Sequence, residues 1–405
     1  MLDAGAAVFA LVCLARLAAE LPARATENDF AHYYASSRLL LEGRDPYTTS
    51  LVAPFARYGF VYEPGVPAET NPPPLVWLFV PLALLPARAA FWFWVALEAA
   101  GLAAVLCLTR RLLGDRLSPR GWYFVCVLAL TSAAVYWHFY FSQVQLLLAA
   151  LVLAAYRWAE TGRPIRACVA VTLGGLLKLF PLVLLPWFIW GAGNGPRAWK
   201  KRLAASACVA AGGVAFTGLG LWKDFCRFGL KIVSADAINH TFNFTLPALV
   251  TNLGLAARGF DVSVGPSRGW SLAALACGLG LIGLTYLWCL RSGEDRERQF
   301  CVLSVAMLAG SVTAWGHYFV FLIFPMTVAA VRLAVRPTVG RVFFFGLLLW
   351  ALNFLRTVES PFLDAHLCAK VLVNNIPLGG LIGLGVFLMG EPGADGARAD
   401  RIDPG

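Results

Sequence analysis

The sequence predicts an all-α fold, a polytopic bundle of transmembrane helices. Of its 405 residues, 59% are hydrophobic and 14% are charged, whereas soluble domains carry roughly 25% charged residues. The mean hydropathy is +0.68. Apolar stretches recur from end to end of the chain, and one membrane span needs about 20 mostly apolar residues. We therefore expect a single membrane-embedded domain over residues 1–390.

The first apolar run, from about Ala4 to Leu21, has the length of a signal peptide. Asp3 precedes it, no Lys or Arg occurs before Arg16, and no good cleavage site follows, so we expect a retained first helix. With the later runs, the pattern predicts about 11–13 transmembrane helices. The later runs lie near residues 72–109, 121–137, 142–158, 165–178, 180–192, 203–222, 270–290, 299–315, 318–335, 342–355 and 371–389.

The stretch 72–109 is longer than one helix requires. If the chain crossed the membrane twice there, all loops before or all loops after this stretch would exchange inside for outside. Basic loops would then lie outside, against the charge rule for membrane proteins. We expect a short re-entrant or surface-lying piece near Pro72–Pro86, followed by one full helix. Short surface helices are also expected in the outer loops.

Lys and Arg are concentrated in alternate loops, around residues 110–120, 157–166, 197–202, 291–298 and 332–341. Positive charge retains a loop in the cytoplasm, so we expect these loops and both termini inside. The other set, 27–71, 137–142, 223–269, 315–318 and 357–370, is expected outside. The net charge of +10 then follows from topology, and no nucleic-acid partner is expected. The polar tail, 391–405, is expected to be disordered and cytoplasmic.

Several familiar motifs are excluded. The ten cysteines are scattered without a CxxC pair, which predicts neither a zinc site nor a disulfide framework. No metal or cofactor is expected. Gly278, Gly280 and Gly283 spell GxGxxG within an apolar run that no strand precedes. We interpret these glycines as helix-packing positions, not as a dinucleotide site.

The first candidate for chemistry is Asp29, just past the first helix and among aromatic residues. A carboxylate at the membrane surface loses part of its hydration, and desolvation raises the pKa of a carboxyl group and makes it a better base. Alternatively, Asn28 or Asp29 caps a short helix running through Ala31–Leu41. The residues alone leave both interpretations open.

A second candidate is Lys178, the only charge between Arg166 and Arg197. A lysine inside an apolar run is energetically expensive and usually has a partner or a function. It lies between two short apolar runs that we expect to meet at the outer face, where a cation would suit a lipid phosphate. The alternative is a side chain that extends to the interface without a specific role.

Polar residues also stand at two outer turns. Gln143 and Gln145 begin a helix, where amides can bind sugar hydroxyls or simply lie at the interface. His317 and Tyr318 lie between two helices, where a histidine can bind phosphate, orient an acceptor or be structural. Asn71, before three prolines, is interpreted as the start of the next membrane segment.

Taken in order, these segments resemble glycosyltransferase family 87, the polyprenyl-phosphate-mannose-dependent mannosyltransferases of the GT-C class. The order and spacing of the pieces carry the resemblance, since no single piece is specific. The pieces are NDFAHYYASSRLLLEGRDPY, NPPPLVWLFVPLALLP, SQVQ, GRPIRA with LKLFPLVLLP, NFTL and GHYFVFLIFP.

The resemblance implies a GT-C-like helix bundle that takes sugar, most commonly mannose, from a polyprenyl-phosphate donor. The sugar would pass, with inversion, to a glycolipid or glycan acceptor on the outer face of the cell inner (plasma) membrane. Asp29 would be the general base, Lys178 and His317 would bind the donor phosphate, and Gln143 would lie near the sugar. The other residues expected to contact sugar or acceptor are Gln145, Tyr33, Tyr318 and Asn243.

One departure and two rival functions remain. The segment expected as GQxN has Ser142, Gln143, Val144 and Gln145 in this chain, which leaves mannose, another hexose or arabinofuranose open as the sugar.

A lipid or sugar transporter would carry binding groups near the midplane, at broken helices related by repeats, and no repeat is visible. A membrane scaffold without catalysis would have no reason to hold a lipid phosphate.

Overall fold

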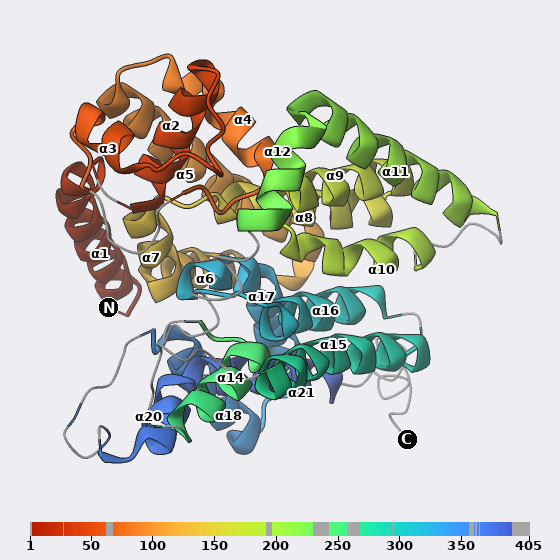
Figure 1. Cartoon of the computed structure of the whole chain (residues 1–405). Helices are drawn as coiled ribbons and strands as arrows, with labels where there is room; N and C mark the ends of the chain where they lie inside the picture. The colour runs from red at the N-terminus through yellow and green to blue at the C-terminus, as the bar shows by residue number, and fades with distance from the viewer. Residues whose placement is uncertain are drawn as a thin grey trace, which may run out of the picture. The chain divides into compact units, whose positions relative to one another are not determined.

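A computed structural model of the chain describes residues 2–26, 28–61, 68–191, 197–229, 243–257, 259, 268–293, 295–355, 360, 363 and 365–390. Helices dominate these ranges (Figure 1), and the β-pairing within them is limited to an isolated bridge between Asn243 and Trp315. The predicted all-α class is confirmed. The tail 391–405 and most of the loop 223–269 lie outside the described residues, so the expectations for them stay predictions.

The chain forms two compact units, Met1–Ala237 with Gly316–Val320, and Ile238–Trp315 with Phe321–Gly405. Each is described by itself, and the expectation of one domain over 1–390 stays a prediction. The helices of the first unit are α1 (Leu2–Arg24), α2 (Asn28–Leu41), α3 (Val52–Tyr58), α4 (Pro73–Ala83), α5 (Ala87–Leu113), α6 (Pro119–Thr131), α7 (Ala133–Phe141), α8 (Gln145–Glu160), α9 (Pro164–Leu177), α10 (Leu185–Trp190), α11 (Ala198–Thr217) and α12 (Leu219–Asp224). Those of the second are α14 (Leu246–Ala256), α15 (Arg268–Arg291), α16 (Arg296–Gly310), α17 (Ile323–Val335), α18 (Val339–Asn353), α20 (Leu367–Asn374) and α21 (Ile376–Met389).

Several helices suit a membrane. In the described ranges, four helical stretches are long and apolar enough to cross one, or seven if each bent helix pair is one span. Large apolar side chains also face outward: Phe216 is 72% exposed and Leu284 66%. An extensive apolar surface of this kind suits lipid and not water. The chain is therefore an integral membrane protein, while its number of crossings stays a prediction.

The stretch 72–109 divides as expected. Helix α4 has 11 residues, which gives a length of about 16 Å, whereas the hydrocarbon core of a bilayer is about 30 Å thick. Helix α5 has 27 residues and is long enough to span. Pro86 is the N-cap residue of α5 and has extended backbone, and its fixed φ and missing N–H group suit a position just before a helix.

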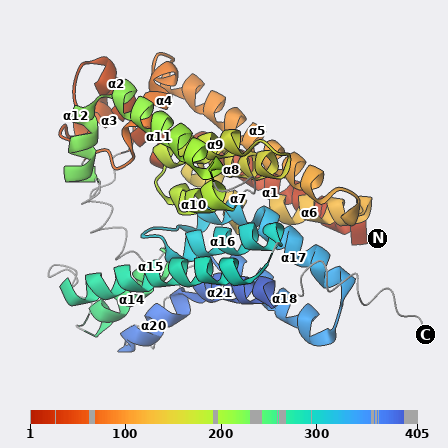
Figure 2. The same ribbon diagram turned by 90° about the vertical axis from the view of Figure 1, so that its right-hand side faces the viewer.

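In the first unit, α8 packs against both α5 and α9, α11 packs against α9, and α2 packs against α4 (Figure 2). Gly101 of α5 allows the close approach to α8, since a Cβ there would lie 3.1 Å from the Leu146 carbonyl carbon. This contact brings the start of α8 against the middle of α5, which matters for the site below.

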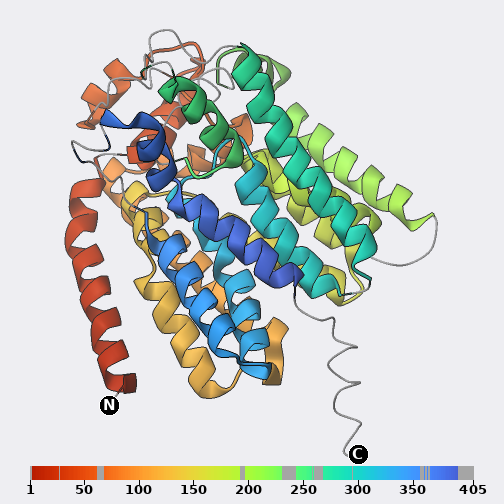
Figure 3. The same cartoon turned by 90° about the horizontal axis from the view of Figure 1, so that it is seen from below.

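In the second unit, α16 packs against both α15 and α21 (Figure 3) and is buried from Arg298 to Gly310. A Cβ at Gly278 of α15 would lie 2.5 Å from the carbonyl oxygen of Gly310, whereas Gly280 and Gly283 face open space. The interpretation of the GxGxxG glycines as packing positions therefore holds for Gly278 and is wrong for the other two.

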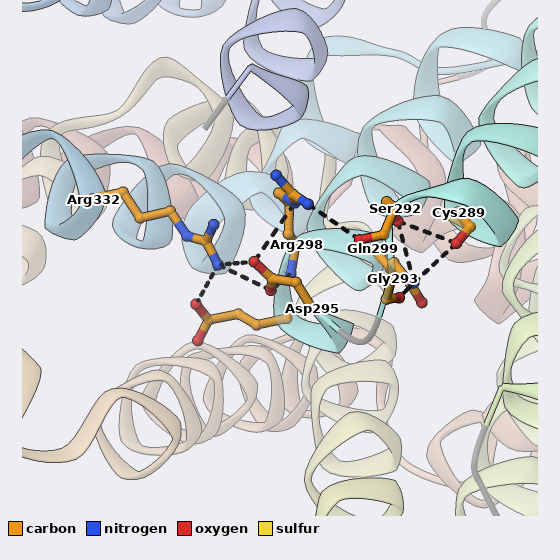
Figure 4. Close-up of polar contacts among 8 residues, drawn as sticks. Cys289, Ser292, Gly293, Asp295, Arg298, Gln299 and Arg332 are labelled. Carbon is orange, nitrogen blue, oxygen red and sulfur yellow. Dashed lines mark hydrogen bonds and ion pairs between the residues drawn. The ribbon is translucent and has the colours of Figure 1, made fainter. Parts of the chain in front are cut away.

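A polar network joins the start of α16 to α17 in the second unit (Figure 4). Arg332 of α17 donates to Asp295 at 3.0 Å and to Glu297 at 3.3 Å. Asp295 caps α16 by accepting from the Arg298 backbone N–H at 3.0 Å, and Gln299 donates to the Gly293 carbonyl at 2.7 Å. The cap satisfies a helix-terminal N–H group that has no partner inside the helix.

Candidate active site

Asp29 lies in the first turn of α2 and is half-buried. Gln143 donates a hydrogen bond from its side-chain amide to Oδ2 of Asp29. The negative charge also suits the positive end of the α2 dipole. Buried rings beside it fix α2: Phe30 lies 5.2 Å from Phe91, and Tyr33 lies 4.8 Å from Phe79, between ring centroids. Asp29 is therefore held on one side and still accessible.

Gln143 is oriented by hydrogen bonds at both ends of its amide. Its Nε2 donates to Asp29, and its Oε1 accepts from the Tyr33 hydroxyl at 3.2 Å. Ser142 precedes it with φ 54°, in the left-handed region, so the chain turns sharply between α7 and α8. Trp94 of α5 donates to the Ser142 carbonyl at 3.0 Å and fixes that turn.

Lys178 follows the last residue of α9 in extended conformation, as expected from its place between two apolar runs. Its Nζ donates to Oδ1 of Asn71 at 2.5 Å and lies 5.9 Å from the centroid of the Tyr33 ring. The ammonium group is also close enough to interact electrostatically with Asp29. The Asp29 carboxylate and the Lys178 ammonium group thus both lie near the Tyr33 side chain.

Asn71 is itself held by a buried carboxylate. Glu69 is 1% exposed, and its Oε1 accepts from the Asn71 backbone N–H at 2.8 Å and from the Asn71 side-chain amide at 2.6 Å. The Asn71 carbonyl accepts from the Tyr47 hydroxyl at 2.6 Å. Burial, with Glu69 and Asp45 adding to it, raises the pKa of Tyr47 well above its ordinary value, so the phenol stays a donor.

His317 and Tyr318 belong to the segment 316–320 of the first unit. Both are buried, and the His317 ring lies 5.7 Å from Phe141 and 5.0 Å from Tyr318. Tyr318 lies 4.9 Å from Phe180, two residues after Lys178. These ring contacts place His317 and Tyr318 beside the segment that carries Lys178.

Near the Gln143 turn, a buried carboxyl group contacts a buried imidazole. Glu98 of α5 and His138 of α7 place Oε2 and Nε2 2.9 Å apart, within ion-pair distance. No hydrogen bond to a described residue satisfies either ring nitrogen of His138. Glu98 also accepts from the Leu147 backbone N–H at 3.4 Å, so it serves as a cap for α8. Such caps matter because the first N–H groups of a helix have no internal partner.

The structure brings together six of the eight expected site residues. These six are Asp29, Tyr33, Gln143, Lys178, His317 and Tyr318. Gln145 is 0% exposed, and its amide has no hydrogen-bond partner among the described residues. Asn243 belongs to the other unit, where it donates to the Val312 carbonyl and accepts from the Ala314 N–H, each at 2.9 Å. Sugar or acceptor contacts by these two residues stay predictions.

The sequence pattern missed Glu69 and Glu98 and undervalued Asn71. Asn71 does begin the segment before α4, but it also holds Lys178. The single signal for Glu98 is a carboxylate inside an apolar run, which is expensive and usually has a role. Glu69 gave no signal, because a glutamate in a polar loop is ordinarily solvated.

Comparisons with known proteins agree with the resemblance. The model of glycosyltransferase family 87 matches residues 70–314, more than half of the chain. A polyprenol-phosphate-mannose-dependent alpha-(1-2)-phosphatidylinositol pentamannoside mannosyltransferase of Mycolicibacterium smegmatis is 26% identical over 286 residues. The alignment covers 68% of this chain and 65% of that protein, so the chain matches just under two thirds of that protein's length. With its membrane-spanning helices and this match, the chain belongs to glycosyltransferase family 87.

Proposed function

We propose that this membrane glycosyltransferase transfers mannose from polyprenyl phosphate to a glycolipid or glycan acceptor, with inversion at the anomeric carbon. The donor class and the sugar follow the name of the mycobacterial relative. The observation that carries the proposal is the link between Asp29 and Lys178. Gln143 bonds both Asp29 and the Tyr33 hydroxyl, and Nζ of Lys178 lies 5.9 Å from the centroid of the Tyr33 ring. Such a pair offers a proton acceptor and a phosphate-binding cation in one place.

Asp29 is proposed as the general base. Gln143 occupies Oδ2 of Asp29, which leaves Oδ1 for the acceptor. The acceptor hydroxyl would attack the anomeric carbon as its proton passes to Asp29, and the bond from that carbon to the phosphate oxygen would break. A single displacement of this kind inverts the configuration. A positioned base of this type contributes about 10²–10⁴-fold in rate.

Lys178 and His317 are proposed to hold the donor phosphate. The leaving polyprenyl phosphate carries away the electron pair of the broken bond, and a cation stabilises that developing charge. Asn71, fixed by Glu69, directs the Lys178 ammonium group. Tyr33, Gln143 and Tyr318 then form the polar and aromatic walls against which a sugar would lie.

We also propose that the site faces the outer side of the cell inner membrane, with both termini in the cytoplasm. The charge distribution supports this orientation, because the loops that carry the site residues are poor in Lys and Arg for their length, and positive charge marks cytoplasmic loops. A lipid-linked donor has its phosphate at the membrane surface, and a site in outer loops would meet it there.

The donor is tested with membranes that contain the full chain. Polyprenyl phosphate carrying labelled mannose, glucose or arabinose is supplied with a crude lipid extract as acceptor, and membranes without the protein are the control. We expect label to move from the mannose carrier to a lipid or glycan product. Transfer from another carrier would change the sugar, and transfer from none would contradict the proposed reaction.

A further inference from the structure

A second polar region of the first unit lies at the other end of α9. A cavity of about 400 Å³ opens between the starts of α9 and α11 and is lined by Arg163, Arg166, Lys201 and Arg202. No carboxylate is among the described residues that line it. The cavity therefore collects three exposed cations beside the buried guanidinium of Arg202.

Three of these cations are available for a ligand. Arg163, Arg166 and Lys201 are exposed, and within the described part of the chain their side chains make no hydrogen bond or ion pair. Arg202 is 2% exposed and donates to the Ile189 carbonyl at 2.7 Å, which fixes a buried guanidinium in the wall. Like charges that line one cavity repel one another, and a bound anion would offset that repulsion.

The two helix ends add to the same field. Helices α9 and α11 have 14 and 20 residues, and neither N-cap residue makes a side-chain capping bond. Helix N-termini are positive and favour acidic residues nearby, yet here the first turns carry Arg166 and Lys201. This arrangement is unfavourable without a ligand and suits an anion.

The surroundings favour a lipid over a soluble anion. Ile165 lines the cavity and is 45% exposed. Trp190, which follows the Ile189 partner of Arg202, is 63% exposed, and tryptophan is enriched at membrane interfaces. The charge rule places these loops on the cytoplasmic side, where the leaflet carries anionic lipids.

We propose that this cavity binds the phosphate group of an anionic membrane lipid. The site is separate from the proposed reaction, because Lys178 lies at the opposite end of α9, about 21 Å away along a 14-residue helix. Its occupant would fix the start of the helix whose end carries Lys178. Any lipid with a phosphate headgroup has the chemistry that this cavity would recognise. The proposal does not depend on sugar transfer.

The test uses the purified full chain in detergent, titrated with phosphatidylglycerol, with phosphatidylcholine or with glycerol phosphate and followed by native mass spectrometry. We expect phosphatidylglycerol to bind about tenfold or more tightly than phosphatidylcholine, because basic residues near a membrane surface attract anionic headgroups. Glycerol phosphate, which lacks acyl chains, should not compete at equal concentration.

Arg166→Gln combined with Lys201→Gln should weaken phosphatidylglycerol binding by about tenfold or more. The matched control is Arg111→Gln with Arg291→Gln, two exposed arginines outside the cavity, and it should stay within about twofold. If the first double variant does not accumulate, Arg163→Gln is titrated in its place, with Arg111→Gln as control. Unchanged binding in the cavity variants, an equal loss in the controls, or full competition by glycerol phosphate would each overturn the proposal.

Discussion

The amide group of Gln143 donates to the Asp29 carboxylate while its carbonyl oxygen accepts from Tyr33. One side chain thus joins the turn before α8 to the first turn of α2. Because Trp94 holds the same turn through the Ser142 carbonyl, the position of Asp29 depends on α5 as well. The candidate base is fixed by three segments far apart in sequence.

Gln143→Ala should therefore impair catalysis. Hydrogen bonds to charged groups contribute about 1.5–3 kcal/mol, so we expect kcat to fall roughly 10- to 100-fold. Initial rates per amount of folded protein measure the effect. Thr161→Ala is the control at the far end of α8, since its exposed hydroxyl donates to the Arg157 carbonyl within that helix, and it should change kcat by less than about threefold. Equal losses in the two variants would refute the specific role of Gln143.

Asn71→Ala should weaken donor binding. Without the side-chain Oδ1 of Asn71, which lies 2.5 Å from Nζ of Lys178, Lys178 loses the contact that directs its ammonium group. KM for the lipid-linked donor should therefore rise about tenfold, by the usual cost of such a bond. Steady-state kinetics with varied donor would show this. Asn353→Ala is the control, because that exposed amide lies in α18, outside the site, and donates to the Leu349 carbonyl of the same helix. A lower kcat with unchanged KM would assign Asn71 to another step.

Ser142→Gly should stabilise the protein. Ser142 has φ 54°, a left-handed conformation that costs about 1–2 kcal/mol in residues with a Cβ and little in glycine. We expect Tm in detergent to rise by about 2–4 °C. Ser142→Ala keeps the Cβ and should not raise Tm, so an equal rise in both variants would count against strain as the cause.

Asp45→Asn should stabilise the loop between α2 and α3 in a pH-dependent way. Burial raises the pKa of Asp45, and the neighbouring Asp224 raises it further. A carboxyl whose folded pKa is raised contributes stability at low pH and loses it as pH rises through the folded pKa. The variant should thus have a higher Tm than wild type at pH 7, and the gain should shrink towards about pH 4. A gain that is constant across this pH range would contradict the assignment.

Features that depend on local sequence could be predicted. Hydrophobic runs predicted the all-α class and the division of 72–109, because span length and apolar content are local properties. The positions of Asp29, Lys178 and His317 at segment ends were also predictable, since a charge or histidine beside an apolar run stands out.

Contacts between distant segments could not be predicted in the same way. The Gln143 bond to Asp29 and the Lys178 bond to Asn71 join residues more than 100 positions apart. The roles of Glu69 and Glu98 depend on burial that arises only when helices pack. Gly280 and Gly283 show the converse, because a motif that suggested packing faces open space.

The central claim is that Asp29 accepts the proton of the acceptor hydroxyl. The direct measurement compares wild type, Asp29→Asn and Asp29→Glu, matched for folded protein, in transfer of labelled mannose from polyprenyl phosphate. We predict that Asp29→Asn lowers kcat by about 10²–10⁴-fold, while donor binding persists and Asp29→Glu retains part of the activity. Transfer by Asp29→Asn at the wild-type rate would contradict the claim.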